Sequence, residues 1–237
     1  MPVDREIHEA AQRGDLATAQ ALLAAEPALA NARDQHEWVP LFYAGHYGHK
    51  EVVELLLEHG ADATVENGQV MHYTMQRRHK DIMEVLIEHG AFDAYVGLPD
   101  QRMRDLFLAI FRAQSDRLAA MLEQAPDLLQ TRGHNGWTLL HYAAEHGDLP
   151  IVQVLLAHGG ESLLHERDNG GATPLCRAVT WLHLGVVKAL VAYGADMDVD
   201  CFGKTTVEWL QWSLEQPWVK DAAVRAEIQA LLDKVGV

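Results

Sequence analysis

Hydrophobic positions in this chain recur at a long and nearly constant interval. A Leu-Leu-x-x-Gly core, complete in Leu56-Leu57-Glu58-His59-Gly60, returns in eroded copies 30 to 35 residues apart. The first apolar residues of these copies are Leu22, Leu56, Leu86, Met121, Leu155 and Leu190. A period of about 33 residues is typical of stacked supersecondary units, because one such unit cannot bury its apolar face alone. The pattern therefore predicts an elongated array of repeats.

The copy at residues 136–156 shows what one unit contains. Thr138 is a good N-cap and Gly147 tolerates the left-handed conformation that ends a helix, so a short helix is expected between them. A second apolar stripe follows at i, i+1, i+4 and i+5, formed by Ile151, Val152, Leu155 and Leu156. This spacing predicts an amphipathic helix. Each unit is therefore predicted to be a turn followed by two helices.

Three copies resemble the ankyrin-repeat pattern G-x-T-P-L-H-x-A-A-x-x-G. The clearest is Gly136-x-Thr138-x-Leu140-His141-x-Ala143-Ala144-x-x-Gly147. A second is Gly171-Ala172-Thr173-Pro174-Leu175-Cys176-Arg177-Ala178, and a third is Val39-Pro40-Leu41-Phe42-Tyr43-Ala44. The resemblance implies an all-α solenoid of about seven helix-turn-helix units, with β-turn fingers between the units and a cap at each end.

The register of the copies predicts a single ankyrin-repeat domain over residues 1–237. Its repeats are expected at about 3–33, 34–65, 66–98, 99–132, 133–167 and 168–199, with a C-terminal cap at 200–237. Repeat 3 lacks the Gly-x-Thr turn, which predicts a shortened finger, and an irregularity is expected between residues 91 and 104. A final helix is predicted near Ala222–Lys234.

A longer period is also present, because residues 22–60 match residues 121–159 at a constant offset of 99. Trp38 pairs with Trp137, and Tyr43 pairs with Tyr142. The chain therefore resembles a duplicated block of three repeats, and similar groups are expected to be presented twice along one face.

Composition narrows the classes of ligand. The 237 residues hold 19 Lys and Arg against 34 Asp and Glu, a net charge of −15. This balance argues against nucleic acid, which needs clustered cations, and no apolar run is long enough to cross a membrane. If the partner is charged, we expect it to be basic. Two cysteines give no disulfide framework, so we expect a reducing cytoplasm, with Cys176 buried and Cys201 exposed.

The ankyrin resemblance places the concave binding face on the fingers and on the last residues of each first helix. Tyrosines one residue after the motif His position border the same groove. The candidate partner-binding residues are His36, Trp38, Tyr43, His46, Tyr47, Tyr73, Gln76, Arg77, Phe111, Arg112, His134, Asn135, Trp137, Tyr142, Glu145, His146, Thr180, Trp181, Phe202 and Trp212. Aromatic residues and arginine are frequent in this set, as they are in binding hot spots.

Most histidines have a structural explanation. The resemblance implies that His8, His72 and His141 tie fingers together. His59, His89 and His158 precede the end of a unit, where a polar side chain suits a helix C-terminus, and His49 and His79 begin second helices. We expect no metal site, no cofactor and no catalytic residue, because no zinc ligand set, phosphate loop or nucleophile motif is present.

The leading hypothesis is a monomeric, non-catalytic protein–protein interaction module that binds its partner in an aromatic-rich, acidic-surrounded concave groove. One alternative is a small-molecule pocket at the irregular repeat 3–4 region. Another is an inhibitor or immunity-like protein that masks a basic partner. The sequence leaves these alternatives open.

Overall fold

The computed structural model describes residues 3–77, 79–96, 101–133 and 135–235. The chain divides into two compact units, Met1–Leu98 and Pro99–Val237. The helices of unit 1 are α1 Val3–Arg13, α2 Leu16–Ala25, α3 Pro40–Tyr47, α4 Lys50–Glu58, α5 Val65–Gln76, α6 Lys80–Glu88 and α7 Ala91–Val96, with a 3-10 turn at Pro27–Asn31.

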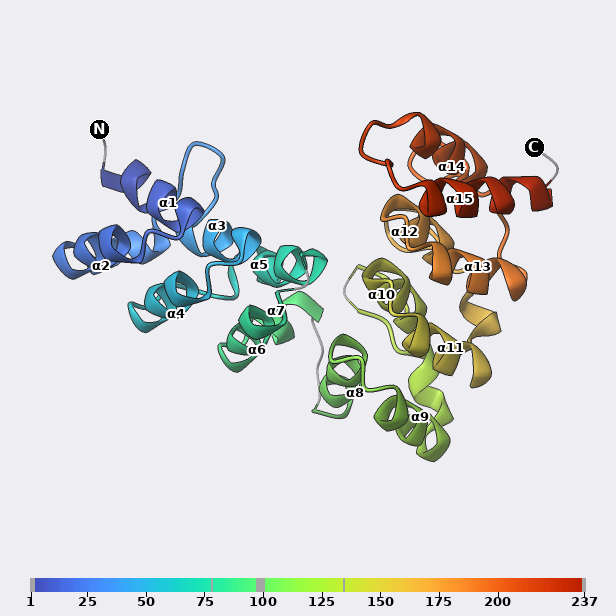
Figure 1. Ribbon diagram of the computed structural model, residues 1–237. Helices are drawn as coiled ribbons and strands as arrows, with labels where there is room; N and C mark the ends of the chain where they lie inside the picture. The colour runs from blue at the N-terminus through green and yellow to red at the C-terminus, as the bar shows by residue number, and fades with distance from the viewer. Residues whose placement is uncertain (1–2, 78, 97–100, 134, 236–237) are drawn as a thin grey trace. The chain divides into compact units, whose positions relative to one another are not determined.

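In unit 1 the helices form two rows (Figure 1). The inner row packs α1 on α3 and α3 on α5, while the outer row packs α2 on α4 and α4 on α6. The finger between α2 and α3 projects as a loop (Figure 1). Only six residues separate α4 from α5, so repeat 3 has no comparable finger. The short helix α7 instead covers α5, where it buries Phe92 and Tyr95.

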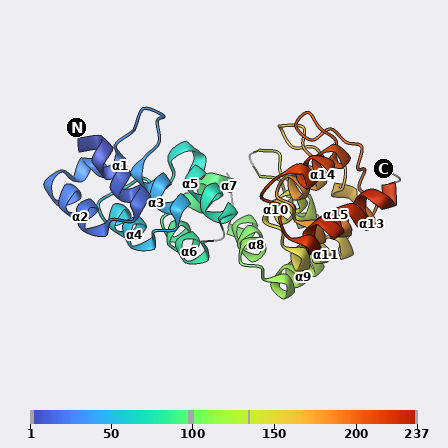
Figure 2. The same ribbon diagram turned by 45° about the horizontal axis from the view of Figure 1, so that its top comes forward.

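Unit 2 has the same two-row construction, which is visible in Figures 1 and 2. Its helices are α8 Gln101–Phe111, α9 Ser115–Gln124, α10 Leu139–His146, α11 Leu149–Ala157, α12 Pro174–Thr180, α13 Leu184–Ala192, α14 Thr206–Glu215 and α15 Ala222–Val235, with 3-10 turns at Pro126–Gln130 and Gly160–Leu163. The inner row is α8, α10, α12 and α14, and the outer row is α9, α11, α13 and α15.

Local signals in the sequence set the helix ends. The Thr138 hydroxyl accepts a hydrogen bond from the His141 amide and begins α10. Thr173 and Thr205 cap α12 and α14 in the same way. Gly147 ends α10 with φ of 67°, a conformation that glycine adopts without steric cost. The predicted helix pairs, caps and final helix are confirmed, and so is the all-α ankyrin-repeat fold class.

Cys176 is buried as predicted, but the predictions of an exposed Cys201 and of no disulfide are wrong. Cys176 and Cys201 form a disulfide with a Cα–Cα distance of 5.2 Å, and both residues are fully buried. Cys176 occupies the motif His position of repeat 6, and in repeat 5 the residue at that position contacts the next finger. A cysteine at this position therefore meets Cys201 in the last finger.

The candidate irregularity between residues 91 and 104 contains the division between the two units. The prediction of a single domain over residues 1–237 concerns how these units are joined, and it stays a prediction. Among the described residues, no helix has the length and apolar character needed to span a membrane.

Candidate functional site

The finger of repeat 2 is fastened to its own inner helix through Asp34. One carboxylate oxygen of Asp34 accepts hydrogen bonds from the amides of His36 (2.8 Å) and Trp38 (3.0 Å). The other accepts one from the Tyr43 hydroxyl at 2.6 Å. Burial opposes ionisation of Asp34, but these hydrogen bonds outweigh it and hold its pKa below the ordinary value. Burial and Asp34 together raise the pKa of Tyr43 to about 12. The finger is therefore held in one conformation.

An aromatic cluster lies beside this finger on α3 and α5. We define the unit 1 aromatic cluster as Trp38, Phe42, Tyr43, His46, Tyr47 and Tyr73. Trp38 stacks on Phe42 with ring centroids 3.9 Å apart, and Tyr73 meets Phe42 edge-on at 5.0 Å. Five members are half-buried, and Tyr47 is 48% exposed. The structure therefore brings five of the predicted residues together, and part of their surface faces solvent.

Arg77 extends the cluster by a hydrogen bond to His46. The guanidinium donates to Nε2 of His46 at 3.1 Å, which requires an unprotonated nitrogen because arginine has no acceptor. Burial lowers the pKa of His46, and the charges of Arg77 and His79 lower it further. His46 is therefore neutral at physiological pH and joins α3 to the exposed end of α5. The side chain of Gln76, a predicted neighbour, lies outside the described residues.

A cavity of about 590 Å³ adjoins the cluster, and Tyr43 belongs to both. It lies between α1 and the finger, and its lining includes Glu9, Gln12, Asp34 and His36. Gln12 also donates to the Tyr47 hydroxyl at 3.3 Å. Cavity and cluster therefore form one continuous surface of aromatic and hydrogen-bonding groups in unit 1.

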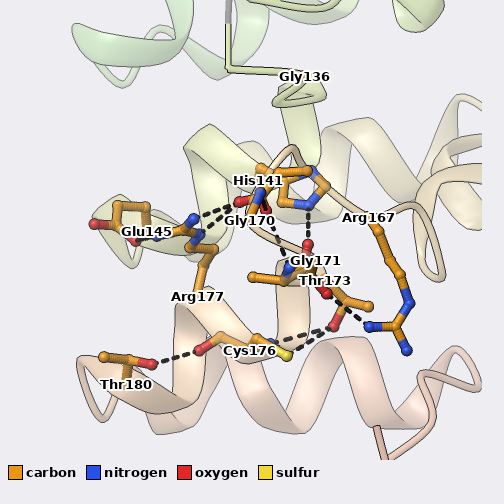
Figure 3. Close-up of polar contacts among 12 residues, drawn as sticks. Gly136, His141, Glu145, Arg167, Gly170, Gly171, Thr173, Cys176, Arg177 and Thr180 are labelled. Carbon is orange, nitrogen blue, oxygen red and sulfur yellow. Dashed lines mark hydrogen bonds and ion pairs between the residues drawn. The ribbon is translucent and has the colours of Figure 1, made fainter. Parts of the chain in front are cut away.

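The corresponding surface of unit 2 is closed. Trp137 is only 5% exposed, although it pairs with Trp38 in the duplication. The guanidinium of Arg177 lies 4.4 Å from the Trp137 ring centroid and 5.2 Å from that of Phe202. Arg177 also forms an ion pair with Asp168 and approaches Glu145 at 4.0 Å; Figure 3 shows Arg177 reaching from α12 towards Glu145 on α10. The interpretation of Trp137 as a docking residue is therefore wrong.

Asp168 anchors the finger that provides this cover. Its carboxylate accepts from the amides of Gly170 (2.8 Å) and Ala172 (3.0 Å), as Asp34 does in repeat 2. Burial opposes ionisation, but Arg177 outweighs it and lowers the pKa of Asp168. The finger also donates a backbone hydrogen bond from Asn169 to Asn135 in the previous finger at 3.0 Å. The finger of the following repeat thus holds, through Asp168, the Arg177 side chain that covers Trp137.

Three other predicted residues of unit 2 belong to the core. Tyr142 is fully buried, where its ring packs edge-on against Phe107 at 4.9 Å. Phe111 and Glu145 are also buried. They lie on adjacent inner helices that pack together, α8 and α10, so their predicted role as groove residues is wrong.

The remaining predicted residues of unit 2 are at least partly exposed to solvent, except one that lies outside the described residues. Arg112, His146, Thr180 and Trp212 are half-buried, and Asn135, Trp181 and Phe202 are exposed. Thr180 donates its hydroxyl to the Cys176 carbonyl at 2.8 Å, so its side chain serves its own helix. His134 lies outside the described residues.

Sequence reasoning missed three residues of these surfaces: Phe42, Asp34 and Arg177. Phe42 occupies the motif His position, and a signal was present because repeat 3 lacks the finger that a histidine there would contact. Asp34 and Asp168 share the position five residues before the helix cap, a periodicity that could have revealed both. Arg177 carried no such signal.

The histidines serve mainly as ties between repeats. His141 contacts the Ala172 carbonyl through Nε2 at 3.0 Å, and His8 contacts that of Trp38 at 2.9 Å. His49 and His183 contact carbonyls at the ends of α1 and α10. His59, His89 and His158 contact their own helix C-termini, as predicted. No group of three or more potential metal ligands occurs within the described ranges.

Comparisons with known proteins agree with this architecture. A family model described as ankyrin repeats (3 copies) matches residues 7–96 and again 106–201. The NAD-capped RNA hydrolase NUDT12 of Homo sapiens is 37% identical over 62 residues, 26% of this chain and 13% of that protein. The 2-5A-dependent ribonuclease of Mus musculus is 36% identical over 69 residues, 29% of this chain and 9% of that protein. The chain therefore covers only a small part of either relative.

Ankyrin repeats are generally protein–protein interaction modules and are typically non-catalytic. Because the matched segments make up most of its length, the chain belongs to the ankyrin-repeat family.

Proposed function

We propose that this chain is a non-catalytic module that binds a protein partner on unit 1, along the aromatic cluster and the adjoining cavity. The observation that carries the proposal is the partly exposed group of indole, phenol and imidazole rings around Phe42. Large aromatic side chains dominate binding hot spots because they bring much area with few torsions to freeze.

The cluster is also preorganised. Asp34 fixes Tyr43, Arg77 fixes His46, and Phe42 supports both Trp38 and Tyr73. Side chains already held in place lose little conformational freedom on binding, which favours affinity. We expect an extended segment of the partner to lie across Tyr47 and Trp38 and to enter the cavity beside Tyr43.

We expect the partner protein to be basic. Six acidic side chains of unit 1 lie on the outer helices α4 and α6: Glu51, Glu54, Glu58, Asp81, Glu84 and Glu88. These six side chains lie away from the cluster. They would therefore attract a basic partner over a distance and speed its association, without contacting it directly. The rate of association with a basic partner should therefore fall as the salt concentration is raised. The hypothesis of an inhibitor that masks a basic partner makes the same prediction.

The test is selection of binding peptides from a displayed library with the full chain, alongside Tyr47→Ala and Trp38→Ala. The matched control is Tyr193→Ala, which removes a similarly exposed tyrosine on unit 2. Peptides enriched by the wild type and the control, but lost with both cluster variants, would support the proposal. Retention of every peptide by the Tyr47→Ala and Trp38→Ala proteins would exclude this surface.

A small-molecule site is the second candidate, and the cavity of about 590 Å³ is the observation that favours it. Its charged lining is largely paired within the protein, since Arg5 binds Glu9 at 3.0 Å and Asp34 binds Tyr43. This pairing leaves few groups for a ligand, so we favour the protein partner. A thermal-shift screen of metabolites tests the alternative, which fails if none stabilises the chain.

A further inference from the structure

The last repeat carries a second exposed aromatic surface, formed by Trp212 on α14 and Trp218 in the loop that follows. Their ring centroids are 5.6 Å apart, and Trp218 is 61% exposed, more than any other large apolar residue in the described part of the chain. Trp212 is half-buried, and together the two rings form a continuous aromatic surface of the kind that marks a docking site.

The backbone holds Trp218 in this exposed position. Arg225 donates hydrogen bonds to the carbonyls of Leu214 at 2.7 Å and Val219 at 3.2 Å, on either side of the loop. Gln216 donates to the Trp212 carbonyl at 3.0 Å, and Val219 is buried beneath the loop. The indole is therefore presented by a fixed loop and needs little ordering when a ligand binds.

The charges around this pair are mainly negative. Glu208 and Glu215 lie four residues before and three residues after Trp212, on the same face of α14. Between residues 208 and 225 the charged residues are three carboxylates, Glu208, Glu215 and Asp221, and two cations, Lys220 and Arg225, of which Arg225 donates to the loop carbonyls. Glu215 is exposed and is in no ion pair among the described residues. This environment favours a cation over the two rings.

The same unit shows how such a surface holds a cation. Arg177 lies between Trp137 and Phe202 with the Asp168 carboxylate beside it, and Lys204 lies 5.8 Å from the Trp209 ring. In the described ranges no cation lies over Trp212 or Trp218. We infer that this tryptophan pair, with Glu208 and Glu215, binds an arginine of a basic segment on a partner protein. This surface is distinct from that proposed on unit 1, and it uses cation–π and carboxylate contacts.

The probe is a short capped peptide, Gly-Arg-Gly-Arg-Gly, titrated into the full chain while the indole N–H resonances are followed by NMR. The resonances of Trp212 and Trp218 should shift, and Trp218→Ala should weaken binding about fivefold or more. Glu215→Gln should weaken it about two- to threefold. The controls are Tyr193→Ala and Glu123→Gln, which remove an exposed ring and an exposed charge elsewhere and should leave binding unchanged.

A peptide with citrulline in place of arginine keeps the shape of the side chain and removes the charge. Binding of this peptide as tight as that of the arginine peptide would overturn the inference. The inference also fails if the arginine peptide does not bind, or if it binds Trp218→Ala as tightly as the wild type. None of these three results affects the unit 1 proposal, whose test depends on Tyr47 and Trp38.

Discussion

Trp38 in unit 1 and Trp137 in unit 2 occupy equivalent positions in a duplicated block, yet only Trp38 is partly exposed. Each precedes an inner helix and contacts an aromatic ring on that helix, Phe42 for Trp38 and Tyr142 for Trp137. The difference comes from the following repeat. Six residues separate α4 from α5, whereas sixteen separate α11 from α12 and form a finger whose Asp168 pairs with Arg177 of α12, the residue that lies over Trp137. Exposure of a repeat's aromatic residue is therefore decided by its neighbour.

The largest expected effect is on stability. Trp137→Ala should lower the free energy of unfolding by about 3–5 kcal/mol, because it empties a buried site. Trp38→Ala should cost about 1 kcal/mol, since that side chain is already partly exposed to solvent. Urea denaturation of both variants measures the difference.

A matched pair provides the control. Leu56 and Leu155 are also related by the offset of 99, and both are fully buried. Leu56→Ala and Leu155→Ala should therefore cost similar amounts, about 2–5 kcal/mol each. Equal costs for the two tryptophan variants would contradict the comparison.

Arg177→Gln removes the cover from Trp137. We expect a loss of about 3 kcal/mol in the free energy of unfolding, because the buried Asp168 carboxylate loses its cation while keeping its two amide donors. The fluorescence of Trp137 should also become accessible to acrylamide, as that of Trp38 already is in the wild type. Unchanged quenching of Trp137 would show that another group buries it.

The disulfide sharpens the contrast further, because both of its cysteines lie in unit 2. Cys176→Ser with Cys201→Ser should destabilise the last repeat by about 3 kcal/mol, as expected for opening a loop of 25 residues. Wild-type protein treated with a reductant should show the same loss. A melting temperature that is insensitive to both changes would argue against the bond.

The smallest effect concerns pH and the motif His position, which holds His141 in repeat 5 and Phe42 in the equivalent repeat 2. Burial lowers the pKa of His141 to about 4, whereas the unfolded residue titrates near 6.5. The unfolded state therefore binds the additional proton as pH falls from 6.5 to 4, so stability decreases with falling pH.

From pH 7 to pH 5 this residue should remove about 2 kcal/mol from the free energy of unfolding. His141→Gln should abolish that part of the pH dependence. Burial is the main cause of the lowered pKa of His141. Its Nδ1 also accepts a hydrogen bond from the Thr138 amide at 3.2 Å, which a proton on that nitrogen would break. An identical pH profile for wild type and variant would contradict this assignment.

The repeat architecture was predictable because it depends on local signals. Thr138, Gly147 and the stripe at Ile151–Leu156 determine a helix pair without reference to distant residues, and the structure has α10 and α11 at those positions. The absent finger of repeat 3 was predictable from its length, whereas α7, which covers α5 in its place, was not.

The accessible surface could be predicted only in part, because exposure depends on pairs of repeats. Nothing within repeat 5 reveals that Arg177, 40 positions after Trp137, lies over that ring. The disulfide was missed for a related reason, since Cys176 meets a finger 25 residues further on. A rule that pairs each motif His position with the next finger would have found the disulfide.

The most direct test of this account is the solvent accessibility of the two equivalent indoles. In the full chain labelled with 5-fluorotryptophan, the fluorine resonances can be assigned with Trp38→Phe and Trp137→Phe, and a soluble gadolinium chelate then added. We expect the Trp38 resonance to broaden markedly and the Trp137 resonance to remain sharp. Broadening of Trp137 equal to or greater than that of Trp38 would contradict the claim that the following repeat decides which aromatic surface is open.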